Sequence, residues 1–247
     1  MRINRFLARA GLGSRRGVED LVRAGRVRVN GEVITDLGRR VDPAEDEILV
    51  DGRPVQARVR PVLLLLHKPV GVISSLRRQG DAPCLTDVLP AGASGLFHVG
   101  RLDRDSSGLL LLTNDGDLAQ HVLHPRHPVW KRYEVRTDWP LADDVLRRWR
   151  EGSEALDGRP LAPVRVERED DPTHLVLQLR EGRNRQIRRM VEAAGARVVS
   201  LHRTAFGPLE LGDLGPGRTR PVRPEEEHAL REIAERRTDV DDPPAGA

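Results

Sequence analysis

Residues 100–116 read Gly-Arg-Leu-Asp-Arg-Asp-Ser-Ser-Gly-Leu-Leu-Leu-Leu-Thr-Asn-Asp-Gly, a polar loop that runs directly into an apolar strand. The loop carries two carboxylates, Asp103 and Asp105, and the strand begins with the four leucines of residues 109–112. An apolar strand of this kind anchors the loop before it, and rigidly anchored loops are where folds place reactive groups. The passage therefore predicts a functional loop at the end of a buried strand.

The sequence around this loop, residues 62–237, has the pattern of an α+β domain. Strand-like apolar runs cover residues 62–67, 109–113, 133–137 and 175–179, and helical patterns cover residues 118–123, 143–151, 186–194 and 224–236. Strands and helices are mixed without strict alternation, which favours a largely antiparallel sheet. Residues 54–61 predict a linker before this domain, and residues 238–247 predict a disordered tail after it.

Residues 1–55 predict a small module of two helices and a β-hairpin. Apolar residues at positions 3, 6, 7 and 10 have helical spacing, Ser14 can cap a second helix, and Asn30-Gly31 is a strong hairpin signal. Arg15-Arg16 and the Val-Arg-Val-Asn-Gly sequence of residues 27–31 resemble the small RNA-binding module first described in a small-subunit ribosomal protein. The resemblance implies that basic residues of the module bind RNA phosphates, and the alternative is that they only solvate its surface. The arginines concerned are Arg5, Arg15, Arg16 and Arg26.

Composition and charge limit the class of protein. The 247 residues contain no apolar run close to the eighteen or so that a membrane span needs, and no apolar secretory segment follows Met1. A single cysteine, Cys84, excludes an internal disulfide and a cysteine-based zinc site. The expected location is therefore cytoplasmic, without a membrane partner. The net charge of +3 hides basic clusters in residues 1–30 and 180–189, which indicate either a polyanionic partner or a solvated surface.

The acidic loop is also compatible with metal binding, and we consider two kinds of site. A calcium loop fits the first positions, but its twelfth position falls on Asn114 instead of a bidentate glutamate, which excludes that interpretation. A two-metal nuclease stays open as an alternative. Its carboxylates would be Asp103, Asp105, Asp115 and Asp117.

Four motifs of this chain resemble those of the pseudouridine synthases. The first is the loop and strand of residues 100–116. The others are His-Lys-Pro-Val-Gly-Val at 67–72, Lys-Arg-Tyr-Glu-Val at 131–135, and Glu-Gly-Arg-Asn-Arg-Gln-Ile-Arg-Arg-Met at 181–190. They follow the order of the family and, with the N-terminal module, span most of residues 1–223. The pattern is most similar to the branch typified by RsuA and RluB, which acts on ribosomal RNA.

The resemblance implies an isomerase that converts a uridine of ribosomal RNA to pseudouridine. It assigns the chemistry to Asp103, as nucleophile or as proton-transfer base, base stacking to Tyr133, and an ion pair with the aspartate to Arg188. The reaction exchanges one bond between ribose and base for another without redox change or net hydrolysis, so neither a cofactor nor a metal is expected. Further RNA contacts are expected from Arg101, Arg183, Arg185 and Arg189.

The resemblance also bears on the target. Residues 183–185 are most similar to the RluB-like form, which favours a uridine of the large-subunit RNA, and a small-subunit target stays an alternative. A rival of another class is a non-catalytic RNA-binding factor of ribosome biogenesis. The intact set of Asp103, Tyr133 and Arg188 favours the enzyme. Nothing in the sequence requires more than a monomer.

Overall fold

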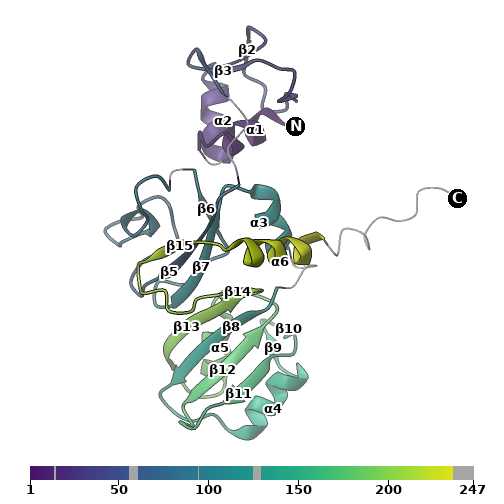
Figure 1. Cartoon of the computed structure of the whole chain (residues 1–247). Helices are drawn as coiled ribbons and strands as arrows, with labels where there is room; N and C mark the ends of the chain where they lie inside the picture. The colour runs from purple at the N-terminus through teal and green to yellow at the C-terminus, as the bar shows by residue number, and fades with distance from the viewer. Residues whose placement is uncertain (14, 56–60, 94, 125–128, 236–247) are drawn as a thin grey trace, which may run out of the picture. The chain divides into compact units, whose positions relative to one another are not determined.

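The computed structural model describes residues 1–13, 15–55, 61–93, 95–124 and 129–235 (Figure 1). The chain forms two compact units. One unit contains Met1–Leu63, Pro90–Phe97 and Leu112–Gly116, and the other contains Leu64–Leu89, His98–Leu111 and Asp117–Ala247. The tail and most of the linker that the sequence predicts lie outside the described residues.

The N-terminal part of the first unit has two helices and a small sheet. The helices are α1 (Ile3–Arg9) and α2 (Arg15–Arg23), and the strands are β1 (Val27–Val29), β2 (Glu32–Ile34), β3 (Ile48–Val50) and β4 (Arg53–Pro54). The strand order is β2-β1-β3-β4. Asn30 and Gly31, which join β1 to β2, have positive φ angles of 51° and 82°, as a type I′ turn requires. The two helices and the hairpin predicted for this region are confirmed.

A nine-stranded sheet forms the framework of the rest of the chain. Its main order is β11-β12-β8-β13-β7-β5-β15, with β6 beside β7 and β14 beside β13. Its members are β5 (Leu63–Lys68), β6 (Phe97–Val99), β7 (Ser107–Thr113), β8 (Lys131–Thr137), β11 (Arg165–Arg168), β12 (His174–Leu179), β13 (Val198–Phe206), β14 (Leu209–Glu210) and β15 (Thr219–Pro221). Strand β13 pairs in parallel with β7 and antiparallel with β8. The sheet is therefore mixed, and the predicted α+β class is confirmed.

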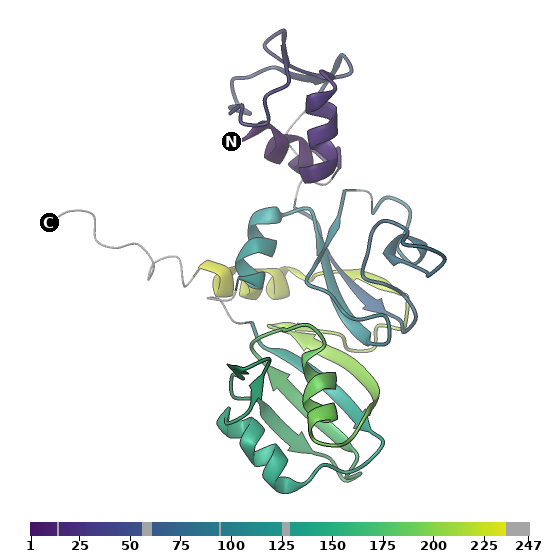
Figure 2. The same cartoon turned by 180° about the vertical axis from the view of Figure 1, so that it is seen from behind.

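Helices cover the sheet where the sequence predicts them. They are α3 (Gly116–Leu123), α4 (Asp143–Glu151), α5 (Gln186–Ala193) and α6 (Pro224–Glu235), with a short 3₁₀ helix at Leu85–Asp87 and a small hairpin of β9 (Ala155–Leu156) and β10 (Arg159–Pro160). Figure 2 shows α5 lying on one face of β12, β8 and β13. Ile187, Met190 and Val191 of this helix belong to the same buried cluster as Leu175 and Leu177 of β12.

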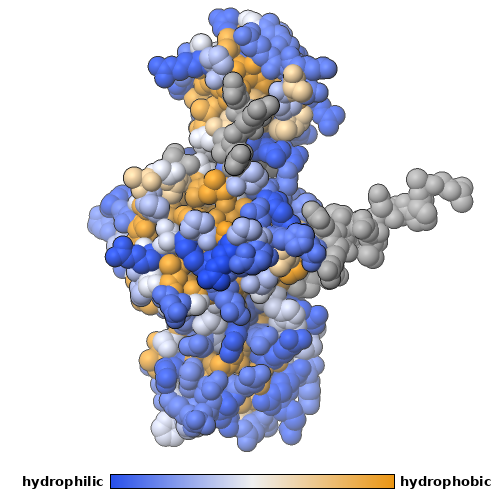
Figure 3. Space-filling model, viewed as in Figure 1, coloured by the Kyte–Doolittle hydropathy of each residue, from blue (hydrophilic) through white to orange (hydrophobic). Residues whose placement is uncertain are grey.

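The outer surface around these elements is polar, as their helical and strand patterns require. Figure 3 shows that hydrophilic residues cover most of the face of β8, β11, β12 and α4 that is seen in this view. No helix among the described residues is long and apolar enough to cross a membrane.

Strand β13 was not predicted, although it is the longest strand in the described part of the chain. Its sequence, Val-Val-Ser-Leu-His-Arg-Thr-Ala-Phe, is not a simple alternation of polar and apolar residues. The register against β8 shifts twice, between Val198 and Ser200 and between Arg203 and Ala205. Such irregularities displace side chains from one face to the other, so a period of two is lost from the sequence.

Strand β7 anchors the acidic loop as expected. Leu109, Leu110, Leu111 and Leu112 are all at most 1 % exposed. At the junction of loop and strand, Gly108 has φ +111° and faces the backbone of Arg203 in β13. A Cβ atom at this position would lie 2.3 Å from the carbonyl oxygen of Arg203, so only glycine fits here without movement. The close approach of β7 and β13 thus fixes where the loop begins.

Candidate active site

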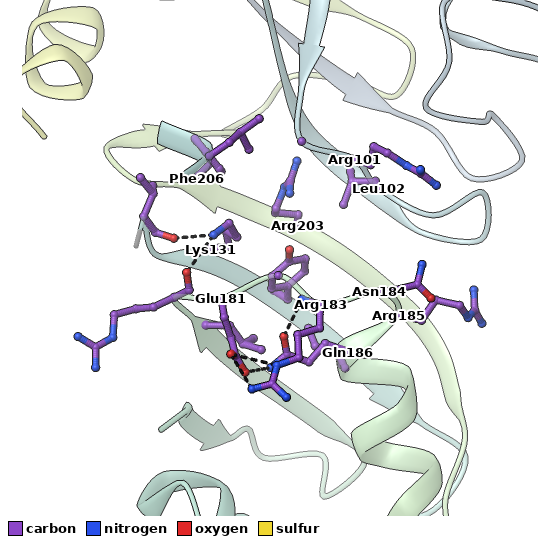
Figure 4. A pocket seen from close by; sticks show the side chains of 18 of the residues that line it. Arg101, Leu102, Lys131, Glu181, Arg183, Asn184, Arg185, Gln186, Arg203 and Phe206 are labelled. Atoms are coloured by element: carbon purple, nitrogen blue, oxygen red, sulfur yellow. Dashed lines mark hydrogen bonds and ion pairs between the residues drawn. The ribbon is translucent and has the colours of Figure 1, made fainter. Parts of the chain in front are cut away.

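A pocket of about 920 Å³ lies within the second unit, between the acidic loop and the strands β8, β12 and β13 (Figure 4). Asp103 and Tyr133 both line it. They come from different elements, the loop before β7 and the middle of β8, which are neighbours only through β13. The fold therefore brings together the two residues to which the resemblance assigns the chemistry and the stacking.

Backbone contacts hold the loop of Asp103 in place. The hydroxyl of Ser74 donates to the carbonyl of Leu102 over 2.6 Å and accepts from the amide of Leu102 over 3.1 Å. The amide of Gly71 donates to the carbonyl of Arg104 over 2.7 Å. The segment that follows His67-Lys68-Pro69 thus supports the acidic loop through hydrogen bonds.

The ion pairs of the loop differ from the expected ones. The sequence analysis pairs Arg188 with Asp103, but the guanidinium of Arg188 lies 3.2 Å from a carboxylate oxygen of Asp105. It also donates to the carbonyl of Asp105 over 2.8 Å and to the hydroxyl of Ser106 over 3.2 Å. The carboxylate of Asp103 is instead 3.7 Å from Arg185.

The reason for the difference is the position of Arg188 in the first turn of α5. Its side chain is only 7 % exposed, and its guanidinium group is occupied by the carbonyl of Asp105, the hydroxyl of Ser106 and the carboxylate of Asp105. Arg185 precedes the helix with a left-handed backbone, φ 48° and ψ 34°, and stays at the surface. Arg188 therefore shapes the loop, whereas Arg185 is the cation beside the carboxylate of Asp103.

Tyr133 is held by the sheet and by the apolar core. It pairs with Leu177 of β12 on one side and Arg203 of β13 on the other. Its ring is partly buried against the cluster that contains Val135 and Ile187. A side chain fixed in this way presents a rigid aromatic surface to the pocket, which is the requirement for stacking on a base that has left its helix.

The pocket also contains Lys131, Arg203 and Phe206, which the sequence analysis did not single out. The ammonium group of Lys131 donates to the carbonyls of Val129 and Arg180, over 2.8 Å and 3.2 Å. Burial, with a smaller contribution from Arg203, lowers the pKa of Lys131 to about 8, and Glu181 opposes the shift. The only sequence signal was that Lys131, one of two lysines in the chain, begins the motif that contains Tyr133.

The other lysine, Lys68, lies under the acidic loop. It is fully buried and donates to the carbonyls of Pro69 and Val72 over 2.8 Å and 2.7 Å. Burial lowers the pKa of Lys68 to about 8, while the negative charges of Asp105 and Asp103 raise it. Because these carboxylates act on Lys68 electrostatically, its ammonium group is close enough to contribute positive potential to the loop.

The arginines expected to contact RNA differ in their exposure and in their contacts. Arg101 is exposed and lines the pocket, and Arg5 is exposed on α1. Arg183 binds Glu181 and the carbonyls of residues 156, 159 and 160, Arg189 pairs with Asp157, and Arg26 pairs with Asp51. The side chains of Arg15 and Arg16 lie outside what the structure describes.

The two-metal nuclease is not supported by the arrangement of the carboxylates. Its four aspartates would have to converge, but within the described ranges no group of three or more His, Cys, Asp or Glu side chains is placed to hold a metal ion. Asp105 is engaged with Arg188 and Arg185. The acidic loop is therefore a set of carboxylates paired with arginines.

Comparison with known families and proteins agrees with this geometry. Residues 62–193 match the family model described as RNA pseudouridylate synthase, and residues 1–48 match the model of the S4 domain. The ribosomal large subunit pseudouridine synthase B of Bacillus subtilis (strain 168) is 37 % identical over 239 residues, which is 95 % of this chain and 97 % of the relative. The ribosomal small subunit pseudouridine synthase A of Yersinia pestis is 35 % identical over 92 % of this chain and 96 % of its own length.

The structural comparison leads to the same family. A crystal structure of a pseudouridylate synthase matches with a TM-score of 0.67 and 29 % sequence identity, and the match covers 93 % of this chain and 99 % of that one. The likeness thus extends over nearly the whole length of both chains. The chain belongs to the RNA pseudouridylate synthase family and carries an N-terminal S4 domain.

Proposed function

We propose that this enzyme isomerises a uridine of large-subunit ribosomal RNA in the pocket that contains Asp103 and Tyr133. The observation that carries the proposal is that these two residues, from different elements, line one pocket large enough for a nucleotide. The membership of the family supplies the reaction, and the pocket supplies the place for it.

The geometry supports the following division of work. The target uridine leaves its stack and enters the pocket, because its glycosidic bond cannot be reached inside a helix. Tyr133 stacks on the uracil while Asp103 acts at the ribose, either by attack on the sugar or by proton transfer. The bond between C1′ and N1 breaks, the base turns and a bond between C1′ and C5 forms. The proton of C5 then passes to water, and N1 takes up a proton. Arg185 fixes the direction of the Asp103 carboxylate, and Arg188 holds the backbone of the loop.

We assign residues 1–55 to a module that docks on ribosomal RNA, residues 62–237 to the catalytic domain and residues 238–247 to a tail. Docking of the module raises the effective concentration of the catalytic domain near its uridine. The exposed Arg5 and Arg101 are the arginines with which we expect RNA phosphates to interact. Because the reaction is an isomerisation and one chain forms the whole pocket, we propose a cytoplasmic monomer that uses neither a cofactor nor a metal.

The choice of the large subunit rests on the match to the Bacillus subtilis relative and on residues 183–185. The name of the relative from Yersinia pestis states a small-subunit target, and a uridine of the small-subunit RNA is therefore the alternative to test. Maps of pseudouridine in ribosomal RNA from cells with and without this enzyme separate the two, since the missing modification falls in one RNA or the other. A loss confined to the small-subunit RNA would refute the large-subunit assignment.

Asp103→Asn is the test of the site. We expect the variant to form no pseudouridine while RNA binding stays within about twofold, because one oxygen is exchanged for nitrogen in a loop held by its backbone. Asp213→Asn, at an exposed position away from the pocket, is the control and should be fully active. Pseudouridine formation by Asp103→Asn would show that the site is wrong. If the wild-type protein bound RNA but formed no pseudouridine, the result would support the alternative of a non-catalytic biogenesis factor.

A further inference from the structure

Two cations share one aromatic ring on one side of the pocket. The ammonium nitrogen of Lys131 lies 5.8 Å from the centre of the Phe206 ring, and the guanidinium carbon of Arg203 lies 5.7 Å from it. Figure 4 shows these three side chains on one side of the pocket and Arg101 and Arg185 on the other. Lys131 belongs to β8, and Arg203 and Phe206 belong to β13, so the sheet fixes the positions of these three residues.

Neither cation forms an ion pair with an acidic side chain among the described residues. In the part of the chain that the structure describes, Lys131 donates only to backbone carbonyls, and Arg203, which is 3 % exposed, donates through Nε to the carbonyl of Leu109. Glu181 is the acid that acts on Lys131, but its two oxygens are bound by Arg183 and Gln186. Withdrawing a cation from water without a counter-charge is costly, and the partial burial of Lys131, with a smaller contribution from Arg203, lowers its pKa. Such a pair is explained by an anion that binds during the reaction.

The reaction itself generates an anion at this place. When the bond between C1′ and N1 breaks, its electron pair stays on the uracil, and the negative charge spreads over N1 and the two carbonyl oxygens. Lys131 is two residues before Tyr133 on β8, so both side chains are on the same face of the strand. Arg203 is directly opposite Tyr133 on β13. A base stacked on Tyr133 therefore has an edge beside both cations.

We propose that Lys131 and Arg203 bind the carbonyl oxygens of the flipped uracil and stabilise the anion of the detached base. The inference rests on the proposed site at Asp103 and Tyr133. The two cations form hydrogen bonds and exchange no proton. The electron pair that the base takes from C1′ returns when C5 attacks C1′; the proton of C5 then passes to water, and N1 takes up a proton from water, so that the product is an isomer of the substrate. Lys131 keeps one N–H for this purpose, since Val129 and Arg180 accept the other two.

The test is the rate of the chemical step in a single turnover. Removal of one preorganised donor from a developing anion costs about 10²–10³-fold in rate, so Lys131→Met should slow this step by about 10²-fold, and RNA affinity should hardly change. Lys131→Arg, which keeps the charge, should recover part of the rate. Arg132→Met removes a cation from the same strand on the opposite face and is the matched control, with an unchanged rate expected.

Chemical rescue separates charge from packing. Lys131→Cys can be modified with aminoethyl methanethiosulfonate, which restores an ammonium group, or with the ethyl reagent, which adds a neutral group of similar length. The native Cys84 is fully buried, so the pocket thiol reacts first. We expect only the aminoethyl adduct to regain at least tenfold in rate. Equal rates for the two adducts would overturn the proposal.

A better leaving group gives a readout that a structural role would not change. Fluorine at C5 stabilises the uracil anion by itself, so RNA with 5-fluorouridine at the target should make breakage of the C1′–N1 bond less dependent on Lys131. The defect of Lys131→Met, followed as loss of the starting nucleotide, should shrink severalfold, and an unchanged defect would refute anion stabilisation. A defect in RNA affinity with a normal chemical step would show that the pair holds a phosphate instead. Asp103→Asn is measured in parallel. If this variant formed pseudouridine, the proposed role of Asp103 would be refuted, and the rescue of Lys131→Cys would then test the role of Lys131 on its own.

Discussion

Replacement of Gly108 by alanine tests how the acidic loop is positioned. A Cβ atom at this residue would lie 2.3 Å from the carbonyl oxygen and 2.5 Å from the amide nitrogen of Arg203. Both are backbone atoms of a central strand, so relief requires that β7 and β13 separate. Overpacking of this kind costs about 1–3 kcal/mol, and a side chain at φ +111° adds about 1–3 kcal/mol of backbone strain. We therefore expect the free energy of unfolding to fall by about 2–6 kcal/mol.

The assay is urea unfolding followed by circular dichroism, with the free energy extrapolated to water. A loss of this size is a large fraction of the stability of an ordinary domain, about 5–15 kcal/mol, so it is easily measured. Gly182→Ala is the matched control: no atom lies within 4 Å of its Cβ position, and we expect a change of at most about 0.5 kcal/mol. If Gly108→Ala were as stable as Gly182→Ala, the close approach of the two strands would be refuted.

Three further predictions concern charge. The single-turnover rate should fall as pH rises through about 8, because the pKa of Lys131 is lowered to about 8 and its cation is lost above that value. The decline should be smaller in Lys131→Arg, where only Lys68, whose pKa is also lowered to about 8, still loses its charge in this range; the same decline in both would contradict the role of Lys131. Arg188→Met should lower the free energy of unfolding by about 1–3 kcal/mol and slow the chemical step more than it weakens RNA binding, because Arg188 donates to the carbonyl of Asp105. Thermal unfolding measures the stability, single-turnover rates measure the chemical step, and titrations measure RNA binding. Arg101→Ala should reduce the slope of log K against log salt by about 1, whereas Arg189→Ala, whose guanidinium is already paired in the protein, should reduce it less.

Much of the fold is encoded locally and could be predicted. The Asn30-Gly31 turn, the leucines of β7 and the apolar spacing of α4 and α5 each act over a few residues, and the structure has these elements within one or two residues of the predicted bounds. Strand β13 could not be predicted, because its two register shifts remove the alternation that marks a strand. Its place between β8 and β7 depends on contacts across the whole sheet.

The candidate site was predictable to the extent that it lies in motifs. Asp103 and Tyr133 were identified by resemblance, and the structure places both in one pocket. The partner of Asp103 was not predicted, because the choice between Arg185 and Arg188 depends on the left-handed backbone at residue 185 and on the depth at which α5 begins. No motif encodes that depth. Arg203 and Phe206 were missed for the same reason as the strand that carries them.

The cationic side chains of the site differ in the groups that surround them. The sequence predicts that Arg183 binds RNA and that Arg188 pairs with Asp103, yet both guanidinium groups donate to backbone carbonyls, and a cation with such partners has little left to offer a phosphate. In the described structure Lys131 is half-buried and Arg203 is buried, and neither forms an ion pair with an acid, so an anion that binds beside them would offset the cost of withdrawing their charges from water. Because an RNA phosphate is charged before and after the reaction, it would bind both states alike and would not speed the chemistry. A charge that exists only after the glycosidic bond has broken would give the two cations a catalytic effect, and for this reason we place the uracil anion beside them.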